Sequence, residues 1–244
     1  IPHGAVDHWL RLKQPALAQS SLILFFVLYV AAMLLVASLW WLSPLVGLSS
    51  FILYSAWHFG ETDLRDWHNY RPSLAFTWGL GLLLTLLFSH FNEFESYLII
   101  YQISLGQAAS TWYLAGLGLG ISLMAISIFN VSKSSFRQMA FTALTLALGA
   151  FLPLLLAFAL YFVAGHSFRG WRHLQEETLG GFKKLLLKAL PFSLLAFVFL
   201  GVSLGLADYY NWLGANYWPI LFVFVAALSA PHVWLMHNFY KQQD

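Results

Sequence analysis

The segment Ser21–Leu42 contains no charged side chain. Because a hydrocarbon core of about 30 Å is crossed by roughly 20 apolar residues in a helix, this segment predicts a membrane span. The rest of the chain has the same character, since 60% of its 244 residues are hydrophobic and 9% are charged. Soluble globular domains carry about 25% charged residues, and disordered chains are poor in apolar ones. The composition therefore excludes both classes.

We predict an all-α fold, a polytopic integral membrane helix bundle that forms a single transmembrane domain over residues 1–244. Hydropathy gives about eight spans, plus the tail of a partial first span that ends near His3. Pro153 divides one long apolar stretch into two helices, because proline cannot continue a helix. The predicted spans are Ser21–Leu42, Leu45–His58, Ser73–Phe91, Thr111–Phe129, Phe136–Gly149, Phe151–His166, Leu185–Leu206 and Pro219–Leu235.

The charged residues separate by side of the membrane. When the predicted spans alternate in direction, all 12 lysines and arginines fall on the side that holds the loop after His3, which we name side A. The opposite side, side B, keeps only Glu93, Glu95 and Asp208. Lysine and arginine concentrate in cytoplasmic loops, so we expect side A to face the cytoplasm.

The chain contains no cysteine and has a formal net charge of only +2. A surface that follows nucleic-acid phosphates needs a basic stripe, so nucleic-acid binding is excluded. Disulfides, thiolate metal sites and cysteine nucleophiles are excluded as well. Any metal must be held by histidine, carboxylate or carbonyl ligands.

Histidines gather at the side A ends of the predicted helices. Five of the nine lie there in clusters of small and acidic residues, namely His3, His58, His166, His173 and His232. Ionisable groups at membrane depth are costly and mark a site or a relay. Because neutral imidazole binds iron, copper and zinc, the clusters predict a metal site. Separate helix-to-helix hydrogen bonds are the alternative interpretation. We expect no metal role for the other four, which are His8, His68, His90 and His237.

Three carboxylates follow these histidines closely along the chain: Asp7, Glu61 and Asp63. A carboxylate that accepts a hydrogen bond from one ring nitrogen fixes the tautomer of a histidine that binds metal through the other. We predict this supporting role for the three residues, with a solvated helix end as the alternative.

Four motifs occur in order along the chain: Pro2-His3-Gly4-Ala5-Val6-Asp7, His58-Phe59-Gly60 with its acidic pair, His166-Ser167 and Pro231-His232. Together they resemble the Brp/Blh family of bacterial and archaeal β-carotene 15,15′-dioxygenases. The resemblance implies an integral-membrane enzyme that uses non-haem iron, Fe(2+), and O₂ to cleave β-carotene at its central double bond, giving two all-trans-retinal. It also implies a place in the lipid of the inner (plasma) membrane, and delivery of retinal to a microbial rhodopsin.

The resemblance implies that His3, His58 and His166 are iron ligands. Family members have their next histidine four residues after the His-Ser motif, where this chain has Gly170. The fourth ligand is then His173 or, as its rival, His232. Aromatic residues near the motifs are expected to line a tunnel for the polyene, and they are Tyr54, Trp57, Phe59, Tyr161 and Trp171.

Three other functions stay open for a membrane protein rich in histidine. Membrane desaturases and hydroxylases bind two irons through close HxxxH and HxxHH runs, which this sequence does not contain. A b-type electron carrier binds haem between histidines on facing helices deep in the bilayer. A proton-coupled transporter uses histidines as a relay.

Overall fold

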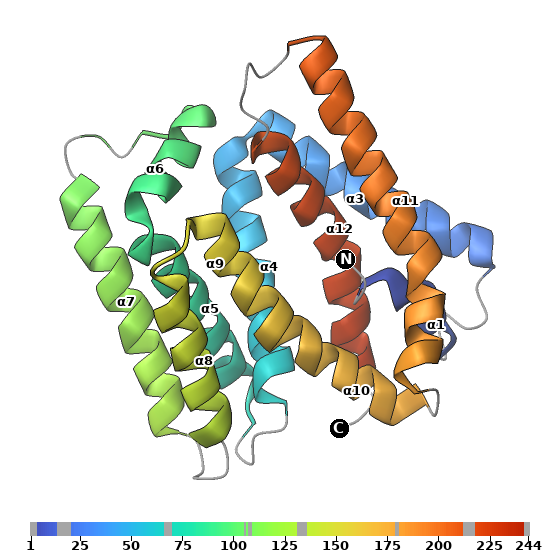
Figure 1. Cartoon of the computed structure of the whole chain (residues 1–244), viewed down its shortest axis with the longest axis horizontal. Coiled ribbons are helices and arrows are strands. Elements are labelled where there is room, and N and C mark those ends of the chain that lie inside the picture. Colours follow the sequence, from blue (N-terminus) through green and yellow to red (C-terminus); the bar gives the residue numbers. More distant parts are fainter. Residues whose placement is uncertain are drawn as a thin grey trace. The chain divides into compact units, whose positions relative to one another are not determined.

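The computed structural model describes residues 4–13, 21–65, 70–104, 106, 109–130, 136–178, 181–211 and 218–241 (Figure 1). These residues form helices joined by short turns and contain no strand, as predicted. In chain order the elements are η1 (Gly4–Val6), α1 (Asp7–Leu10), η2 (Arg11–Lys13), α3 (Leu22–Leu42), α4 (Pro44–Leu64), α5 (Pro72–Ser89), α6 (Phe91–Ile100), α7 (Ala109–Phe129), α8 (Phe136–Gly149), α9 (Leu154–Leu160), the π-helical segment η5 (Tyr161–Ser167), α10 (Phe168–Thr178), α11 (Phe182–Tyr209) and α12 (Trp218–Lys241).

Six helical segments are long and apolar enough to cross a membrane, which fits a multi-pass membrane protein. The predicted count of eight is not confirmed. Helix α8 has 14 residues, a length of about 21 Å, and falls short of a core of about 30 Å. Helix α4 carries the Glu61 and Asp63 carboxylates near its end and is not among the six. The six are Leu22–Leu42, Pro72–Ser89, Ala109–Phe129, Leu154–Gln175, Phe182–Tyr209 and Ile220–Lys241.

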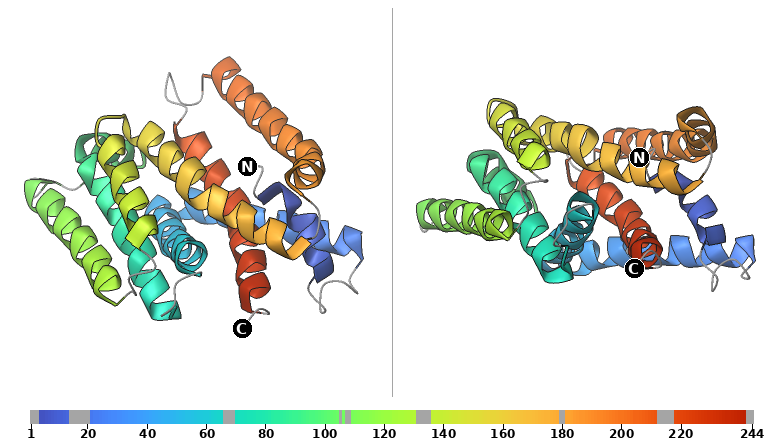
Figure 2. Two further views of the ribbon diagram at one scale, coloured as in Figure 1. Left: turned by 60° about the horizontal axis from the view of Figure 1, so that its bottom comes forward. Right: turned by 90° about the horizontal axis from the view of Figure 1, so that it is seen from below.

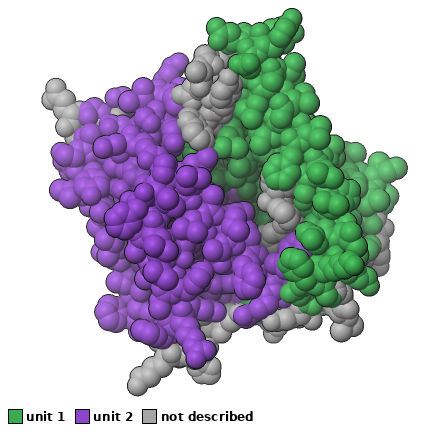
Figure 3. Space-filling view, viewed as in Figure 1, with its two compact units in different colours: residues 1–51, 173–244 green, residues 52–172 purple. Residues whose placement is uncertain are grey.

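The chain divides into two compact units (Figure 3). Unit 1 comprises residues 1–51 and 173–244, and unit 2 comprises residues 52–172. The division into two units does not test whether the chain forms a single transmembrane domain, which stays a prediction. Within unit 1, α3 packs along α12, and the short N-terminal helices pack on α11 and α12. Within unit 2, α5 and α7 lie side by side over most of their length (Figure 2).

Small residues let α4 and α5 cross at very close range inside unit 2. A Cβ atom on Gly60 would overlap the carbonyl oxygen of Ala75, and one on Gly79 would overlap that of Ala56. Each helix therefore presents an alanine and a glycine four residues apart to its neighbour. Such small-residue pairs allow helix backbones to touch in membranes. This crossing fixes the end of α4 that carries His58 and the two buried carboxylates.

His90 joins the end of α5 to the turn between α8 and α9. Its Nδ1 contacts the Leu86 carbonyl oxygen at 2.9 Å, and its Nε2 contacts those of Gly149 and Leu152 at 3.1 and 3.0 Å. Close by, Glu93 accepts a hydrogen bond of 2.8 Å from the backbone N–H of Leu154, where α9 begins. The break between α8 and α9 agrees with the prediction made from Pro153. His90, expected to bind no metal, thus contacts backbone carbonyls.

We predict that Gly60→Ala destabilises the protein by about 1–3 kcal/mol, because the added methyl group must push α4 away from α5. The matched control is Gly118→Ala on α7, where an added Cβ meets no atom within 4 Å. Alanine is the better helix former, so the control is expected to keep or slightly raise the unfolding temperature. Thermal unfolding in detergent measures both. Equal stability of the two variants would contradict the proposed contact.

Candidate metal centre

Two buried histidines face each other in unit 2. His58 lies on α4, and His166 lies on the π-helical segment η5. Their Nε2 atoms are 3.1 Å apart, and the two rings are inclined by 74°. The residues are 3% and 0% exposed. Two helices far apart in the sequence thus bring one imidazole nitrogen each to the same point.

The spacing of this pair suits a metal ion. With a metal–nitrogen bond of about 2.1 Å, two ligands at right angles lie about 3.0 Å apart. The observed 3.1 Å between the Nε2 atoms of His58 and His166 is close to that value. Imidazole nitrogen is also a suitable donor for iron. Without an ion, one ring donates a hydrogen bond to the other.

The π-helical turn explains how His166 comes to share a side of its helix with Tyr161. In an α-helix, residues five apart point about 140° away from each other. A π-helix bonds residue i to residue i+5 and has a wider turn, so it brings such residues toward the same side. Both side chains accordingly point to Asp63: the Tyr161 hydroxyl donates to Oδ2, and Nδ1 of His166 lies 4.0 Å from Oδ1. Single π turns are frequent at functional sites.

Asp63 is the centre of a buried polar network in unit 2. Its Oδ2 accepts hydrogen bonds from the Tyr161 hydroxyl and, at 3.2 Å, from the Trp78 indole. Its Oδ1 lies 2.7 Å from Nη1 of Arg169, and only 1% of the Asp63 side chain is exposed. The network connects α4, α5, η5 and α10. At 4.0 Å, His166 is too far from Asp63 for a direct hydrogen bond, so the carboxylate acts on this ring through the helices that it holds.

A second carboxylate and histidine meet in unit 1. Asp7 Oδ1 lies 2.8 Å from Nδ1 of His232, and Asp7 Oδ2 accepts a hydrogen bond of 2.9 Å from Tyr29. Because the carboxylate can only accept, Nδ1 of His232 carries a proton and Nε2 is left as the nitrogen able to bind a metal. The Gly4 backbone lies directly beside this ring, since a Cβ there would be 3.4 Å from His232 Cγ.

The remaining histidines of unit 1 have other surroundings. His173 Nδ1 lies 3.0 Å from the hydroxyl of Tyr240, and both residues are buried. A hydroxyl can donate or accept, so this contact does not fix the tautomer of His173. His8 stacks on Phe192 at 4.3 Å between ring centroids. Removal from water lowers the pKa of His8, with a smaller contribution from the Lys188 ammonium, so the ring is neutral at pH 7.

The roles predicted for the other site residues stay predictions. His3 and His68 fall outside the described residues. Glu61 and Trp171 are buried, Tyr54 is half-buried, and Trp57 packs on Phe76 of α5 at 6.4 Å. Among the described residues, no group of three or more histidine, aspartate or glutamate side chains is arranged to hold a metal ion. The whole ligand set, the His58–His166 pair included, therefore stays a prediction.

Sequence reasoning missed three polar partners of the carboxylates: Trp78, Arg169 and Tyr29. Arg169 follows His166 by three residues, a spacing that puts both on one side of a helix, and this signal was available. Trp78 and Tyr29 lie 15 and 22 residues from their carboxylates in the sequence, and no local pattern connects them.

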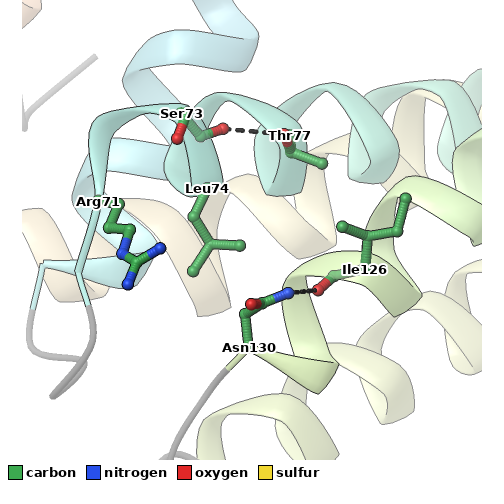
Figure 4. A pocket seen from close by; sticks show the side chains of 6 residues that line it. All are labelled: Arg71, Ser73, Leu74, Thr77, Ile126 and Asn130. Carbon is green, nitrogen blue, oxygen red and sulfur yellow. Dashed lines mark hydrogen bonds between the residues drawn. The ribbon is translucent and has the colours of Figure 1, made fainter.

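A cavity of about 290 Å³ lies elsewhere in unit 2, between the start of α5 and the end of α7 (Figure 4). Thr77 donates to the Ser73 carbonyl oxygen, and Asn130 donates to that of Ile126, each at 2.8 Å. None of the described residues that line the cavity has an imidazole or a carboxylate, and the cavity does not include His58 or His166. Its lining residues are Arg71, Ser73, Leu74, Thr77, Ile126 and Asn130.

The apolar helices and the buried histidine pair define a multi-pass membrane protein with a candidate imidazole metal centre. The family model described as BCD: Beta-carotene 15,15′-dioxygenase matches residues 1–240, so the chain belongs to this family. The predicted resemblance is confirmed, and the protein is a β-carotene 15,15′-dioxygenase that acts on a carotenoid. The match favours this function over a desaturase, a haem carrier or a transporter. No curated protein and no solved structure matches the chain significantly.

We predict that Asp63→Asn destabilises the protein by about 3 kcal/mol, because it removes the charge that balances the largely buried Arg169 guanidinium. Chemical denaturation in mixed micelles measures the loss. The double variant Asp63→Asn/Arg169→Gln is the control, and it should lose less than the sum of the two single variants. Additive losses would show that the two side chains are not coupled.

Proposed function

We propose that the enzyme is a non-haem iron(II) oxygenase that cleaves β-carotene at its central 15,15′ double bond with O₂, giving two molecules of all-trans-retinal. The observation that carries this proposal is the His58–His166 pair, with both Nε2 atoms directed to one point 3.1 Å apart in a buried part of unit 2. When bound, iron(II) supplies the redox chemistry that activates O₂ toward the polyene.

His58 and His166 would hold the ion, and the family motifs add His3 and one of His173 or His232. Of these two, His232 has the stronger support, because the Asp7 carboxylate holds the proton on Nδ1 and so selects the tautomer that carries its lone pair on Nε2. The Tyr29 hydroxyl fixes Asp7 in turn. This chain of contacts orients an imidazole in the way that histidine ligands of metals are usually oriented.

The apolar environment suits the substrate. β-Carotene has no polar group and dissolves in the bilayer core, so an enzyme with membrane-spanning helices meets it there. The burial of His58 and His166 excludes water from the point where their nitrogens meet, which protects reactive species from side reactions. Because the substrate offers no hydrogen-bonding group, its position must come from the shape of the apolar walls.

The location and the partners extend the proposal. All 12 basic residues fall on side A when the eight predicted spans alternate, and this favours a metal centre toward the cytoplasmic side of the plasma membrane. O₂ and membrane lipid are the further partners. Retinal is an apolar aldehyde that would leave through lipid and reach a microbial rhodopsin in the same membrane.

We predict that cells that accumulate β-carotene lose their colour and form retinal when they express this protein. His58→Ala and His166→Ala should lower retinal formation by at least about 100-fold and release the iron. Removing a residue that only hydrogen-bonds to a metal ligand already lowers metal affinity or activity by about 10–100-fold, so removing the ligand itself should cost more. His237→Ala, at a histidine expected to bind no metal, is the control and should keep both. Persistent colour with folded, iron-loaded protein would refute the proposal.

The fourth ligand is decided by iron content. We predict that His232→Ala loses iron and that Asp7→Asn weakens iron binding by about 10–100-fold, because an amide holds Nδ1 less firmly than a carboxylate. A chelator titration of purified protein measures the affinity, with Tyr29→Phe expected to lie between Asp7→Asn and wild type. If His173→Ala loses iron while His232→Ala keeps it, His173 is the ligand.

A further inference from the structure

Three phenylalanine rings continue from His166 in unit 2, and we name them the phenylalanine stripe: Phe59, Phe158 and Phe162. Phe59 and Phe162 contact the His166 ring at 4.4 and 5.4 Å between centroids. Phe158 stacks on Phe162 at 6.0 Å with 15° between the planes, and Phe59 contacts both at 6.2 and 6.0 Å. The rings form one continuous apolar surface that begins at the histidine.

The stripe follows the helix that carries His166. Phe158, Phe162 and His166 are spaced by four residues, so they form a row along α9 and η5. The row extends about 12 Å along the axis. It belongs to the membrane-span candidate Leu154–Gln175, and it runs from His166 toward the start of α9. An extended molecule placed against the stripe would therefore lie along the span.

The surroundings of His166 are divided into a polar and an apolar side. Its Nδ1 points toward Asp63, whose carboxylate is occupied by Trp78, Tyr161 and Arg169. Its ring lies against Phe59 and Phe162.

Burial decreases along the stripe. Phe59 is buried at 4% exposed, whereas Phe158 and Phe162 are half-buried. Phe158 and Phe162 pack against the buried core of unit 2 and keep part of their apolar surface exposed, and this surface suits an apolar ligand.

We propose that the phenylalanine stripe is a binding subsite for one half of a conjugated polyene, and that it determines which double bond lies at the histidine pair. The proposal rests on the proposed function. A carotene has no polar group, so its position along its own length can be set only by contacts with its chain and by the point where its end group stops. Aromatic rings in a row provide that contact surface.

Shortening the stripe should let the polyene slide. Phe162→Ala and Phe158→Ala remove contact area next to the histidine pair and one turn beyond it. Cleavage then occurs at neighbouring double bonds as well, and each such event gives two carbonyl products of unequal length instead of two retinals: an aldehyde with a methyl ketone where the cleaved bond carries a methyl group, and two aldehydes where it does not. Phe162→Leu keeps most of the side-chain volume but removes the aromatic ring, so it serves as the test variant if Phe162→Ala fails to fold.

The test uses purified protein with iron and β-carotene, with chromatography and mass spectrometry of the carbonyl products. We expect apocarotenals and apocarotenones of unequal length to reach at least about a tenth of the products in Phe158→Ala and Phe162→Ala. Phe168→Ala is the matched control, because Phe168 follows on the same helical run and is 68% exposed. It should form retinal only. The proposal would be overturned if every stripe variant formed retinal as its sole product, whatever its turnover rate.

A binding measurement separates this proposal from the proposed function. Quenching of tryptophan fluorescence by β-carotene in lipid nanodiscs reports binding without iron and without turnover. We expect binding at least about 10-fold weaker for the double variant Phe158→Ala/Phe162→Ala, and unchanged binding for Phe168→Ala. If the wild-type protein is inactive but the double variant binds β-carotene more weakly and Phe168→Ala binds it normally, the oxygenase reaction is refuted and the subsite proposal stands. Equal binding by all variants would refute the subsite.

Discussion

The buried Asp63 carboxylate is the interaction on which the candidate centre in unit 2 depends. An uncompensated charge in an apolar bundle is very costly, so the groups that compensate it must be held in place. They come from three different elements, since Trp78 lies on α5, Tyr161 on η5 and Arg169 on α10. Their convergence fixes the helical run that carries His166 against α4, which carries His58. The position of both imidazoles therefore follows from the geometry of one carboxylate.

The same constraint accounts for the irregular helix. Tyr161 and His166 are five residues apart, and an α-helix would direct only one of them to Asp63. The π turn lets both point there and leaves the ring of His166 against Phe59 and Phe162. The polar groups are thus used inside the protein to hold the helices. The apolar groups are left on the side where a hydrocarbon substrate can be accommodated.

Sequence patterns predicted the helical architecture, because hydrophobic length is a local signal, and clustered imidazoles singled out His58 and His166, whose metal role stays a prediction. The predicted count of eight spans is not confirmed, since α8, with 14 residues, is not among the six described helices that are long and apolar enough to cross a membrane. The close crossing of α4 and α5 at Gly60 and Gly79 requires that the faces carrying the small residues pack against each other. The sequence of one helix alone does not say which face of the other helix it will contact. The π turn was also hidden, since it arises from tertiary partners rather than from propensity.

The contacts of the histidines in this chain show why residue type alone does not assign a ligand. His90 contacts backbone carbonyl oxygens, His8 stacks on Phe192, His232 faces a carboxylate, and His58 and His166 face each other. In the last two cases an Nε2 either faces a partner nitrogen or belongs to a ring whose Nδ1 proton is accepted by a carboxylate. These are the conditions under which neutral imidazole offers a lone pair to a metal. The partner of each ring, more than its depth in the membrane, therefore separates a candidate ligand from a structural histidine.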